Sequence, residues 1–283
     1  MKSKATSPAP HAARTVQRRR TGSAVADERD ELAVEEPLEI RVEGRPVAVT
    51  MRTPGHDEEL AAGFLLTEGV VARREDIVGI APAKAKRGGG AEANVVDVKL
   101  ARPEAVDFAR LTRHVFTASS CGLCGKATIA AVQAKNPGLL PEVGPRLAAE
   151  TLLRLPAALA AAQATFQRTG GLHATGLFTA GGQLLVVRED VGRHNAVDKV
   201  IGHLLLGGAI DPASVVLLVS GRVAFEIVQK ALAARIAFLA AISAPTSLAV
   251  DFARSSGQTL VGFLRDGRMN VYAGADRING EGR

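Results

Sequence analysis

The stretch that decides the fold is residues 214–242, SVVLLVSGRVAFEIVQKALAARIAFLAAI. Two uninterrupted apolar runs predict strands at 214–220 and 236–242, and the segment between them predicts a helix at 223–234. Runs without polar alternation are typical of strands that are covered on both faces of a sheet. A strand, a helix and a second strand joined by short links therefore predict a layered α/β domain.

The alternation of strands and helices continues on both sides of this stretch. The predicted strands are 173–180, 184–189, 259–265 and 269–273, and the predicted helices are 156–166, 196–206 and 246–255. Pro156 would occupy the first position of its helix, where a proline is tolerated. An Asp266-Gly267 turn joins the last two strands as a hairpin, so we expect a mixed sheet rather than a purely parallel one.

The amino-terminal half has a different pattern. Apolar and polar residues alternate at 38–42 and 46–51 around a Glu43-Gly44 turn, which predicts a hairpin. A short helix with Asp57 as its N-cap follows, and then strands at 77–80 and 94–100. The sequence thus predicts three parts, which are a disordered basic tail at 1–34, a small strand-rich domain at 35–115 and the α/β domain at 116–283.

The positive charge of the chain is concentrated at its start. The net charge is +6, and residues 1–20 hold six basic side chains and no acidic one, which leaves 29 basic and 29 acidic side chains elsewhere. A nucleic-acid-binding protein would carry its positive charge on the folded surface. We therefore expect no nucleic-acid partner, and the composition of the tail, rich in Ser, Pro and Ala, predicts disorder.

The sequence contains no predicted membrane span. The longest uncharged apolar stretch, 236–250, is interrupted by Pro245 and is shorter than the roughly 20 residues that a span needs. Arg18-Arg19 resembles the start of a twin-arginine export signal, but no apolar region follows it. We expect a cytoplasmic protein, and the lack of a cysteine framework for disulfides agrees with that location.

Both cysteines, Cys121 and Cys124, lie in the segment SSCGLCGK at 119–126. A following helix start and the Lys126 ammonium would both favour the reactive thiolate form. Such a pair can exchange disulfides, carry a persulfide sulfur or supply half of a tetrahedral zinc site. The chain offers no second cysteine pair, and the H-x-E and P-C-x-x-C signatures of zinc deaminases are absent, so we expect no structural metal.

Five separated motifs resemble a known family. They are CGLCG at 121–125, GGLH at 170–173, REDVGRHNAVDK at 188–199, SAPT at 243–246 and GFLR at 262–265. These motifs, in this order, resemble the formate dehydrogenase accessory sulfurtransferases, the FdhD family. The resemblance covers nearly all of residues 35–272, and nothing carries over to the tail.

The resemblance implies a sulfur carrier. It would accept sulfane sulfur from a cysteine desulfurase and pass it to the bis-guanine-dinucleotide molybdenum cofactor, a bound substrate, before that cofactor enters formate dehydrogenase. It further implies a deaminase-like α/β domain without the zinc, and a homodimer. Cys121 is expected to carry the persulfide, and Cys124 would release the sulfur by forming an internal disulfide.

The resemblance also places the cofactor-binding residues on the terminal hairpin, with two histidines as further candidates. The hairpin residues are Phe263, Leu264, Arg265, Asp266, Gly267 and Arg268, whose arginines suit phosphate. A solvated hairpin tip is the alternative. His194, with Asn195, is either a polar site group or part of a helix cap, and His173 is either a hydrogen-bonded histidine near the sheet or part of the transfer pocket.

Two other functions remain open on the sequence. A thiol-disulfide oxidoreductase would use the same cysteine pair and should reduce a model disulfide. A non-catalytic escort would bind the cofactor and tolerate replacement of both cysteines by serine.

Overall fold

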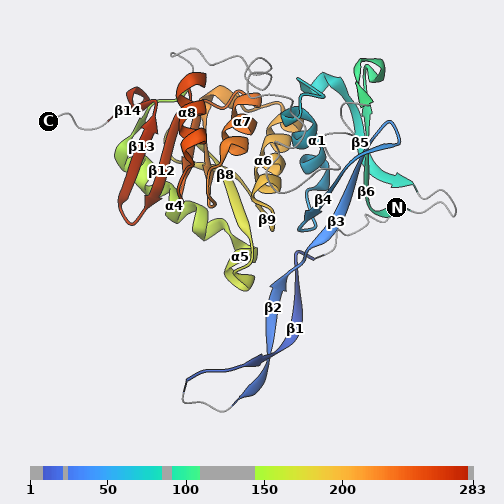
Figure 1. Cartoon of the computed structure of the whole chain (residues 1–283), viewed down its shortest axis with the longest axis horizontal. Coiled ribbons are helices and arrows are strands. Elements are labelled where there is room, and N and C mark those ends of the chain that lie inside the picture. Colours follow the sequence, from blue (N-terminus) through green and yellow to red (C-terminus); the bar gives the residue numbers. More distant parts are fainter. Residues whose placement is uncertain (1–8, 22–24, 85–90, 109–143, 280–283) are drawn as a thin grey trace.

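The computed structural model describes residues 9–21, 25–84, 91–108 and 144–279. The boundary predicted between residues 115 and 116 lies outside them. The described helices and strands form one six-stranded sheet with helices on both faces, a four-stranded sheet beside it and a projecting two-stranded arm (Figure 1).

The six-stranded sheet is mixed, as predicted. Its strand order is β13-β12-β11-β10-β8-β9. The strands are β8 (His173–Thr179), β9 (Leu184–Asp190), β10 (Val215–Val219), β11 (Phe238–Ala241), β12 (Thr259–Arg265) and β13 (Arg268–Ala273). β10, β11 and β12 are parallel to one another, whereas β8 and β13 pair antiparallel with their neighbours. The carboxyl ends of the three parallel strands therefore share one edge.

Helices cover both faces of this sheet, which explains the uninterrupted apolar runs. Val216 and Leu218 of β10 pack against α4 (Ala149–Ala162) in one core cluster. Val215, Leu217 and Val219 pack on the opposite face, in the cluster that holds α6 (Arg193–Gly207), α7 (Phe225–Ala233) and α8 (Ser247–Ser256). Because successive side chains point to opposite faces, every position of a doubly covered strand must be apolar.

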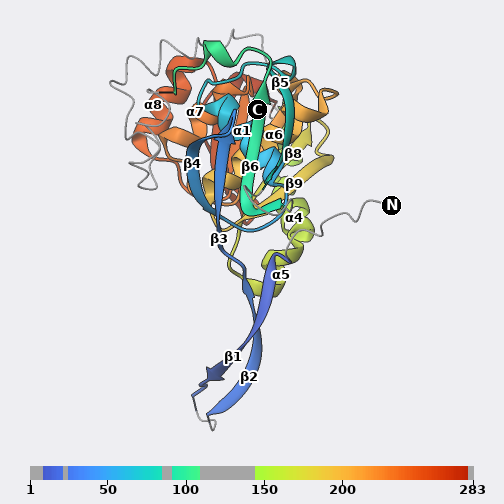
Figure 2. The ribbon, with the colours of Figure 1, turned by 90° about the vertical axis from the view of Figure 1, so that its right-hand side faces the viewer.

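The smaller sheet has the order β4-β3-β6-β5. Its strands are β3 (Glu36–Val42), β4 (Arg45–Arg52), β5 (Ile77–Lys84) and β6 (Ala91–Leu100). Helix α1 (Asp57–Thr67) packs its leucines on this sheet and also crosses α6, so it lies between the two sheets (Figures 1 and 2). At the crossing, a Cβ atom on Gly63 or Gly202 would overlap the backbone carbonyl of Asp198 or Glu59, respectively. Both glycines are therefore needed for this close approach.

Shorter elements complete the described chain. They are α5 (Ala164–Thr169), the paired strands β7 (Leu147–Ala148) and β14 (Ile278–Asn279), and 3₁₀ helices at Arg74–Asp76, Pro103–Ala105, Pro212–Ser214 and Ala275–Arg277.

The prediction of a disordered tail is wrong for residues 11–18 and 26–33. These form β1 (His11–Arg18) and β2 (Ala26–Ala33), an antiparallel hairpin that projects from the body as an arm (Figures 1 and 2). Composition misled the prediction because basic β1 faces acidic β2. Arg18 lies 3.0 Å from Glu28 across the strands. At the base of the arm, Arg168 of α5 makes two hydrogen bonds to the Glu31 carboxylate.

Two helix starts also differ from prediction. Pro156 lies inside α4 rather than at its start, because the buried stripe of Leu152, Leu155 and Leu159 extends the helix toward the amino terminus. Asp57 is the first residue of α1 and not its cap. The cap position belongs to His56, and the Asp57 carboxylate accepts two hydrogen bonds of 2.9 Å from the buried Arg52 guanidinium.

The helix crossing yields a stability prediction. Gly202→Ala should lower the free energy of unfolding by at least about 2 kcal/mol, because its methyl group must push α1 and α6 apart. Gly207→Ala, in the last turn of the same helix, meets no atom within 4 Å and should be neutral or slightly stabilising. Urea unfolding of the two variants makes the comparison, and equal stabilities would show that the crossing is not close-packed.

Candidate functional site

The predicted catalytic thiols, Cys121 and Cys124, lie outside the described residues. We therefore describe the candidate site from the other predicted residues, beginning at the edge of the six-stranded sheet where the carboxyl ends of its parallel strands lie. In open α/β sheets this edge is where ligands bind.

His173 reaches this edge because β8 runs antiparallel to β10. Ser220, just after β10, exchanges two hydrogen bonds of 2.9 Å with Ala174, one through its backbone N–H and one through its hydroxyl. His173 also pairs with Asp190, the last residue of β9. At Gly221 a Cβ atom would lie 3.3 Å from Nδ1 of His173 and 3.6 Å from Cβ of Arg193. These contacts gather His173, Asp190, Arg193, His194 and Arg222, which we call the edge cluster.

Asp190 holds the edge cluster in place. Its buried carboxylate lies 2.7 Å from Nζ of the buried Lys199. It also accepts hydrogen bonds from the backbone N–H of Gly192 at 2.8 Å and of Thr53 at 3.2 Å, and from the Asn195 side chain at 3.0 Å. The carboxylate thus connects the start of α6 to the segment after β4.

Asn195 is not a helix cap, so that alternative for the His194-Asn195 pair is wrong. The N-cap of α6 is Gly192, and no side chain caps this helix. The Asn195 amide instead donates to the Met51 carbonyl at 2.8 Å as well as to Asp190. From sequence alone, an asparagine near a helix start can be a helix cap or a polar group of the site. The hydrogen bond to Met51 of the neighbouring strand β4 rules out the cap.

The two histidines of the cluster are held in their neutral form. Burial lowers the pKa of His194 to about 3, and the positive charges of Lys230 and Arg193 act in the same direction. Burial, together with Arg193 and Arg222, also lowers the pKa of His173, although Asp190 opposes the shift. His173 lies at the edge of the sheet, at the start of β8, and its part in a transfer pocket stays a prediction.

The terminal hairpin lies on the same edge, at the end of β12. Asp266 and Gly267 have positive φ angles of 54° and 70°, as a two-residue type I′ turn requires. Arg265 and Arg268 pair across this turn and are exposed. The Arg265 guanidinium lies 5.7 Å from the Phe263 ring centroid. Nε of Arg265 lies 3.9 Å from the exposed Asp266 carboxylate, and both arginines are accessible to a ligand from solvent.

Leu264 and the histidines differ in position from the hairpin arginines. Leu264 is fully buried in the core beside α4, so only its backbone could touch a ligand. Within the edge cluster, Arg222 follows β10, two strands from β12, and His173 begins β8, three strands from β12. The structure therefore brings the predicted cofactor residues to one edge but divides them into two groups.

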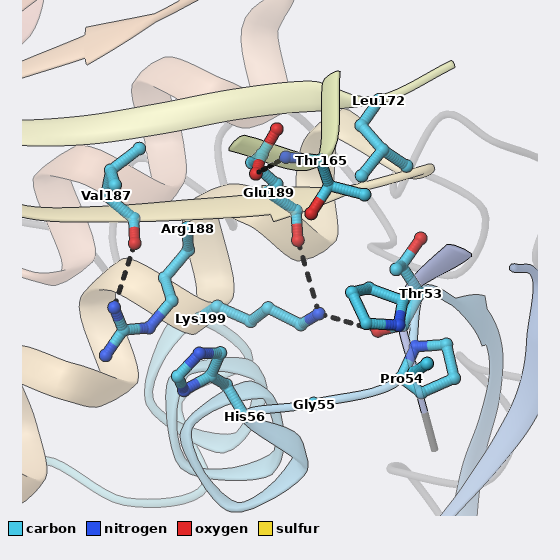
Figure 3. A pocket seen from close by; sticks show the side chains of 12 residues that line it. Thr53, Pro54, Gly55, His56, Thr165, Leu172, Val187, Arg188, Glu189 and Lys199 are labelled. Atoms are coloured by element: carbon cyan, nitrogen blue, oxygen red, sulfur yellow. Dashed lines mark hydrogen bonds between the residues drawn. The ribbon is translucent and has the colours of Figure 1, made fainter. Parts of the chain in front are cut away.

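A cavity of about 360 Å³ lies between the segment 53–56 and β9 (Figure 3). Its lining includes Thr53, His56, Arg188, Glu189 and Lys199. Figure 3 shows the Lys199 ammonium reaching the backbone carbonyls of Thr53, at 2.8 Å, and of Glu189. Sequence reasoning missed this cavity. Lys199 and Arg188 stand in the motif at 188–199, but their neighbours on the segment 53–56 are far away in sequence.

Arg193 and Arg222 are also absent from the sequence-based set of site residues. Arg193 lies within the quoted motif at 188–199, so it could have been proposed, whereas Arg222 belongs to no quoted motif. What the two arginines share is their position near the His173 imidazole, whose pKa both of them lower.

Two absences concern the described residues alone. Within the ranges given above, no three His, Asp or Glu side chains are arranged to hold a metal ion. No helix among the described elements is long and apolar enough to cross a membrane.

The fold and the site define an α/β protein whose sheet edge carries cations and neutral imidazoles, with a cysteine pair elsewhere in the same chain. The family model described as FdhD/NarQ matches residues 33–279. The chain belongs to the FdhD/NarQ family, which confirms the resemblance drawn from the five motifs.

Relatives and a solved structure agree with this membership. The chain is 54% identical over 257 residues to the sulfur carrier protein FdhD of Streptomyces coelicolor, covering 90% of this chain and 91% of the relative. It is 55% identical to the protein of the same name from Mycobacterium tuberculosis, with 87% and 91% covered. A crystal structure from Desulfotalea psychrophila, described as that of a formate dehydrogenase accessory protein, matches with a TM-score of 0.73 and 25% identity, covering 96% of this chain and all of that one.

The buried His194 generates a prediction about pH. The unfolded chain binds a proton at this imidazole near pH 6.5, whereas the folded protein does so only near pH 3. Stability conferred by the neutral form is therefore present above pH 6.5 and is lost as the pH falls. Between pH 7 and 5 the loss from this group should be about 2 kcal/mol.

The measurement is the free energy of unfolding in urea at pH 7, 6 and 5, for the wild type and for His194→Gln. The variant lacks the titrating group, so its stability should fall less steeply with decreasing pH. Parallel curves for the two proteins would contradict a buried, neutral His194.

Proposed function

We propose that this protein carries sulfur as a persulfide on Cys121, from a cysteine desulfurase to the bis-guanine-dinucleotide molybdenum cofactor that formate dehydrogenase requires. The observation that carries the proposal is the combination of the Cys121/Cys124 pair with more than 50% identity to proteins named sulfur carrier protein FdhD. The name supports sulfur transfer in general. The cysteine pair supports the persulfide as its chemical form.

Loading of the carrier is a thiol exchange. The Cys121 thiolate attacks the outer sulfur of the donor persulfide, a new S–S bond forms at Cys121, and the donor cysteine leaves as a thiolate. Attack by Cys124 on Cys121 would release the outer sulfur as sulfide and leave a disulfide for a thiol reductant to reopen.

The substrate carries guanines and phosphates, so its site needs cations and hydrogen-bond donors. The exposed Arg265 and Arg268, paired across a tight turn, support the hairpin as the place of phosphate contact. The Arg265 guanidinium is 5.7 Å from the Phe263 ring centroid, within the range of a cation–π contact. His173 and His194 add neutral polar groups on the same edge of the sheet.

The family resemblance supplies the remaining parts of the proposal. The donor is a cysteine desulfurase, the recipient of the sulfurated cofactor is formate dehydrogenase, and the carrier acts as a homodimer in the cytoplasm. The FdhD names of the relatives and the accessory-protein description of the solved structure support the link to formate dehydrogenase.

Persulfide formation is the direct test. Incubation with a cysteine desulfurase and cysteine should add one sulfur atom to the protein in mass spectrometry, and a reductant should remove it. The added mass should vanish in Cys121→Ala and persist in Cys124→Ala, because Cys121 is the acceptor.

The reverse pattern would exchange the roles of the two cysteines, and added mass in both variants would refute the carrier mechanism. Reduction of insulin by the wild type, with no persulfide formed, would favour a thiol-disulfide oxidoreductase. Full support of formate dehydrogenase by a variant with both cysteines replaced by serine would favour an escort.

Guanine nucleotide binding tests the hairpin. Arg265→Ala and Arg268→Ala should each weaken GDP binding about tenfold, because a charge-assisted bond to phosphate is worth about 1.5–3 kcal/mol. Lysine should restore little affinity, since it lacks the planar fork. Arg154→Ala removes an exposed arginine from α4 and is the charge-matched control in calorimetry. Unchanged GDP affinity in both hairpin variants would favour the alternative, that the hairpin is a solvated tip without contact to the nucleotide.

A further inference from the structure

The edge cluster contains more positive charge than its one carboxylate can neutralise. Asp190 is already paired with Lys199, at 2.7 Å. In the described part of the chain, Arg193 and Arg222 have no ion pair, although both act electrostatically on the His173 imidazole. Two guanidinium groups therefore share one end of the sheet without a counter-ion from these residues.

Two buried polar atoms at the same place lack hydrogen-bond partners. They are Nε of Arg193 and Nε2 of His194. Most buried polar atoms in folded proteins are hydrogen-bonded, and exceptions are concentrated where a ligand or a functional group completes the set. Neither atom belongs to the hairpin that we propose for guanine nucleotide contact.

We propose that the edge cluster is an anion site that binds a phosphate or pyrophosphate group between Arg193 and Arg222, with His173 and His194 as neutral hydrogen-bonding groups. The guanidinium fork matches two phosphate oxygens at once, and a doubly charged group would balance both arginines. Gly221 suits this role because its missing side chain leaves His173 and Arg193 close to each other.

The identity of the ligand rests on the proposed function in one respect. A substrate with two guanine dinucleotide parts has two separate diphosphate groups. The hairpin follows β12, whereas Arg222 follows β10, two strands away at the same edge of the sheet. One edge can therefore bind two anionic groups of the same molecule, the first at Arg265 and Arg268 and the second at Arg193 and Arg222.

His173 provides a signal for binding at the edge cluster. The charged and titratable groups that act on it are Arg193 from α6, Arg222 from the segment before α7 and Asp190 from β9, with His194 beside it. Burial and the two arginines lower the pKa of His173 in the free protein, and Asp190 opposes them. A bound anion adds negative charge and must raise this pKa.

The experiment is a titration of the full chain, labelled with ¹⁵N-histidine, with inorganic pyrophosphate. His173→Gln assigns one of the six histidine signals. We expect pyrophosphate to shift the His173 signal and to raise its titration midpoint. Arg193→Gln and Arg222→Gln should each weaken pyrophosphate binding at least tenfold in calorimetry, whereas Arg154→Gln, the charge-matched control, should bind as the wild type does.

Several results would overturn the proposal. One is the absence of a His173 response in the wild type. Another is full affinity in Arg222→Gln, a variant at an exposed position that should fold normally. An equal response of the His173 signal to chloride at the same ionic strength would show that the shift comes from screening of charges and not from a bound anion. Loss of the His173 response in Arg265→Ala would assign the binding to the hairpin instead.

The source of the phosphate follows from a parallel titration with GDP. A shift of the His173 signal with GDP would indicate that the site binds the phosphates of a nucleotide. A shift with pyrophosphate alone would indicate that the site binds a free anion. Persulfide formation on Cys121 is measured separately in the wild type and in Arg154→Gln, which both keep the edge cluster intact. Failure of the anion site and failure of the carrier function are therefore distinguishable.

Discussion

The buried ion pair of Asp190 and Lys199 is the interaction on which the arrangement of the site depends. Both side chains are almost completely excluded from solvent. Removal of one partner from such a pair costs about 3–5 kcal/mol, because the remaining charge stays buried. Here the pair has a further role, since Asp190 also binds the backbone at Gly192 and at Thr53. One carboxylate thus fixes the start of α6 against the segment that leaves the smaller sheet, and the edge cluster keeps its shape only while that connection holds.

The chemical character of the sheet edge follows from this arrangement. Because Lys199 neutralises Asp190, the carboxylate does not neutralise the arginines beside it. Burial keeps His194 neutral, so it offers a polar atom without a charge of its own. The edge therefore presents permanent positive charge from arginines, which do not deprotonate in proteins, next to imidazoles that do not repel them. This charge is what would attract an oxyanion to the anion site that we propose.

The doubly covered strands were predictable because their pattern is local. Strand β12 has the predicted bounds, and β10 and β11 lie within theirs. Local patterns failed where a distant partner decides the outcome. Asn195 was a candidate helix cap, but its amide donates a hydrogen bond to the Met51 carbonyl instead. Pro156 was expected to start a helix, but the buried leucines before and after it extend that helix toward the amino terminus. The arm resembles a disordered tail because composition does not show that its basic strand faces an acidic one. The hairpin arginines could be predicted because they are neighbours in sequence, across a two-residue turn. The proximity of Arg222 to His173 could not, because the two residues are far apart in sequence.

The crossing of α1 and α6 has a consequence for how the protein unfolds. Gly63 and Gly202 bring the two helix backbones into direct contact, and the buried Asp198 of α6 binds both Thr67 of α1 and Lys230 of α7. A helix that belongs by sequence to the smaller sheet is thus part of the packing of the larger one. Neither sheet can lose its structure without exposing apolar surface and a buried charge of the other. We therefore expect the two sheets to unfold together, as one cooperative unit.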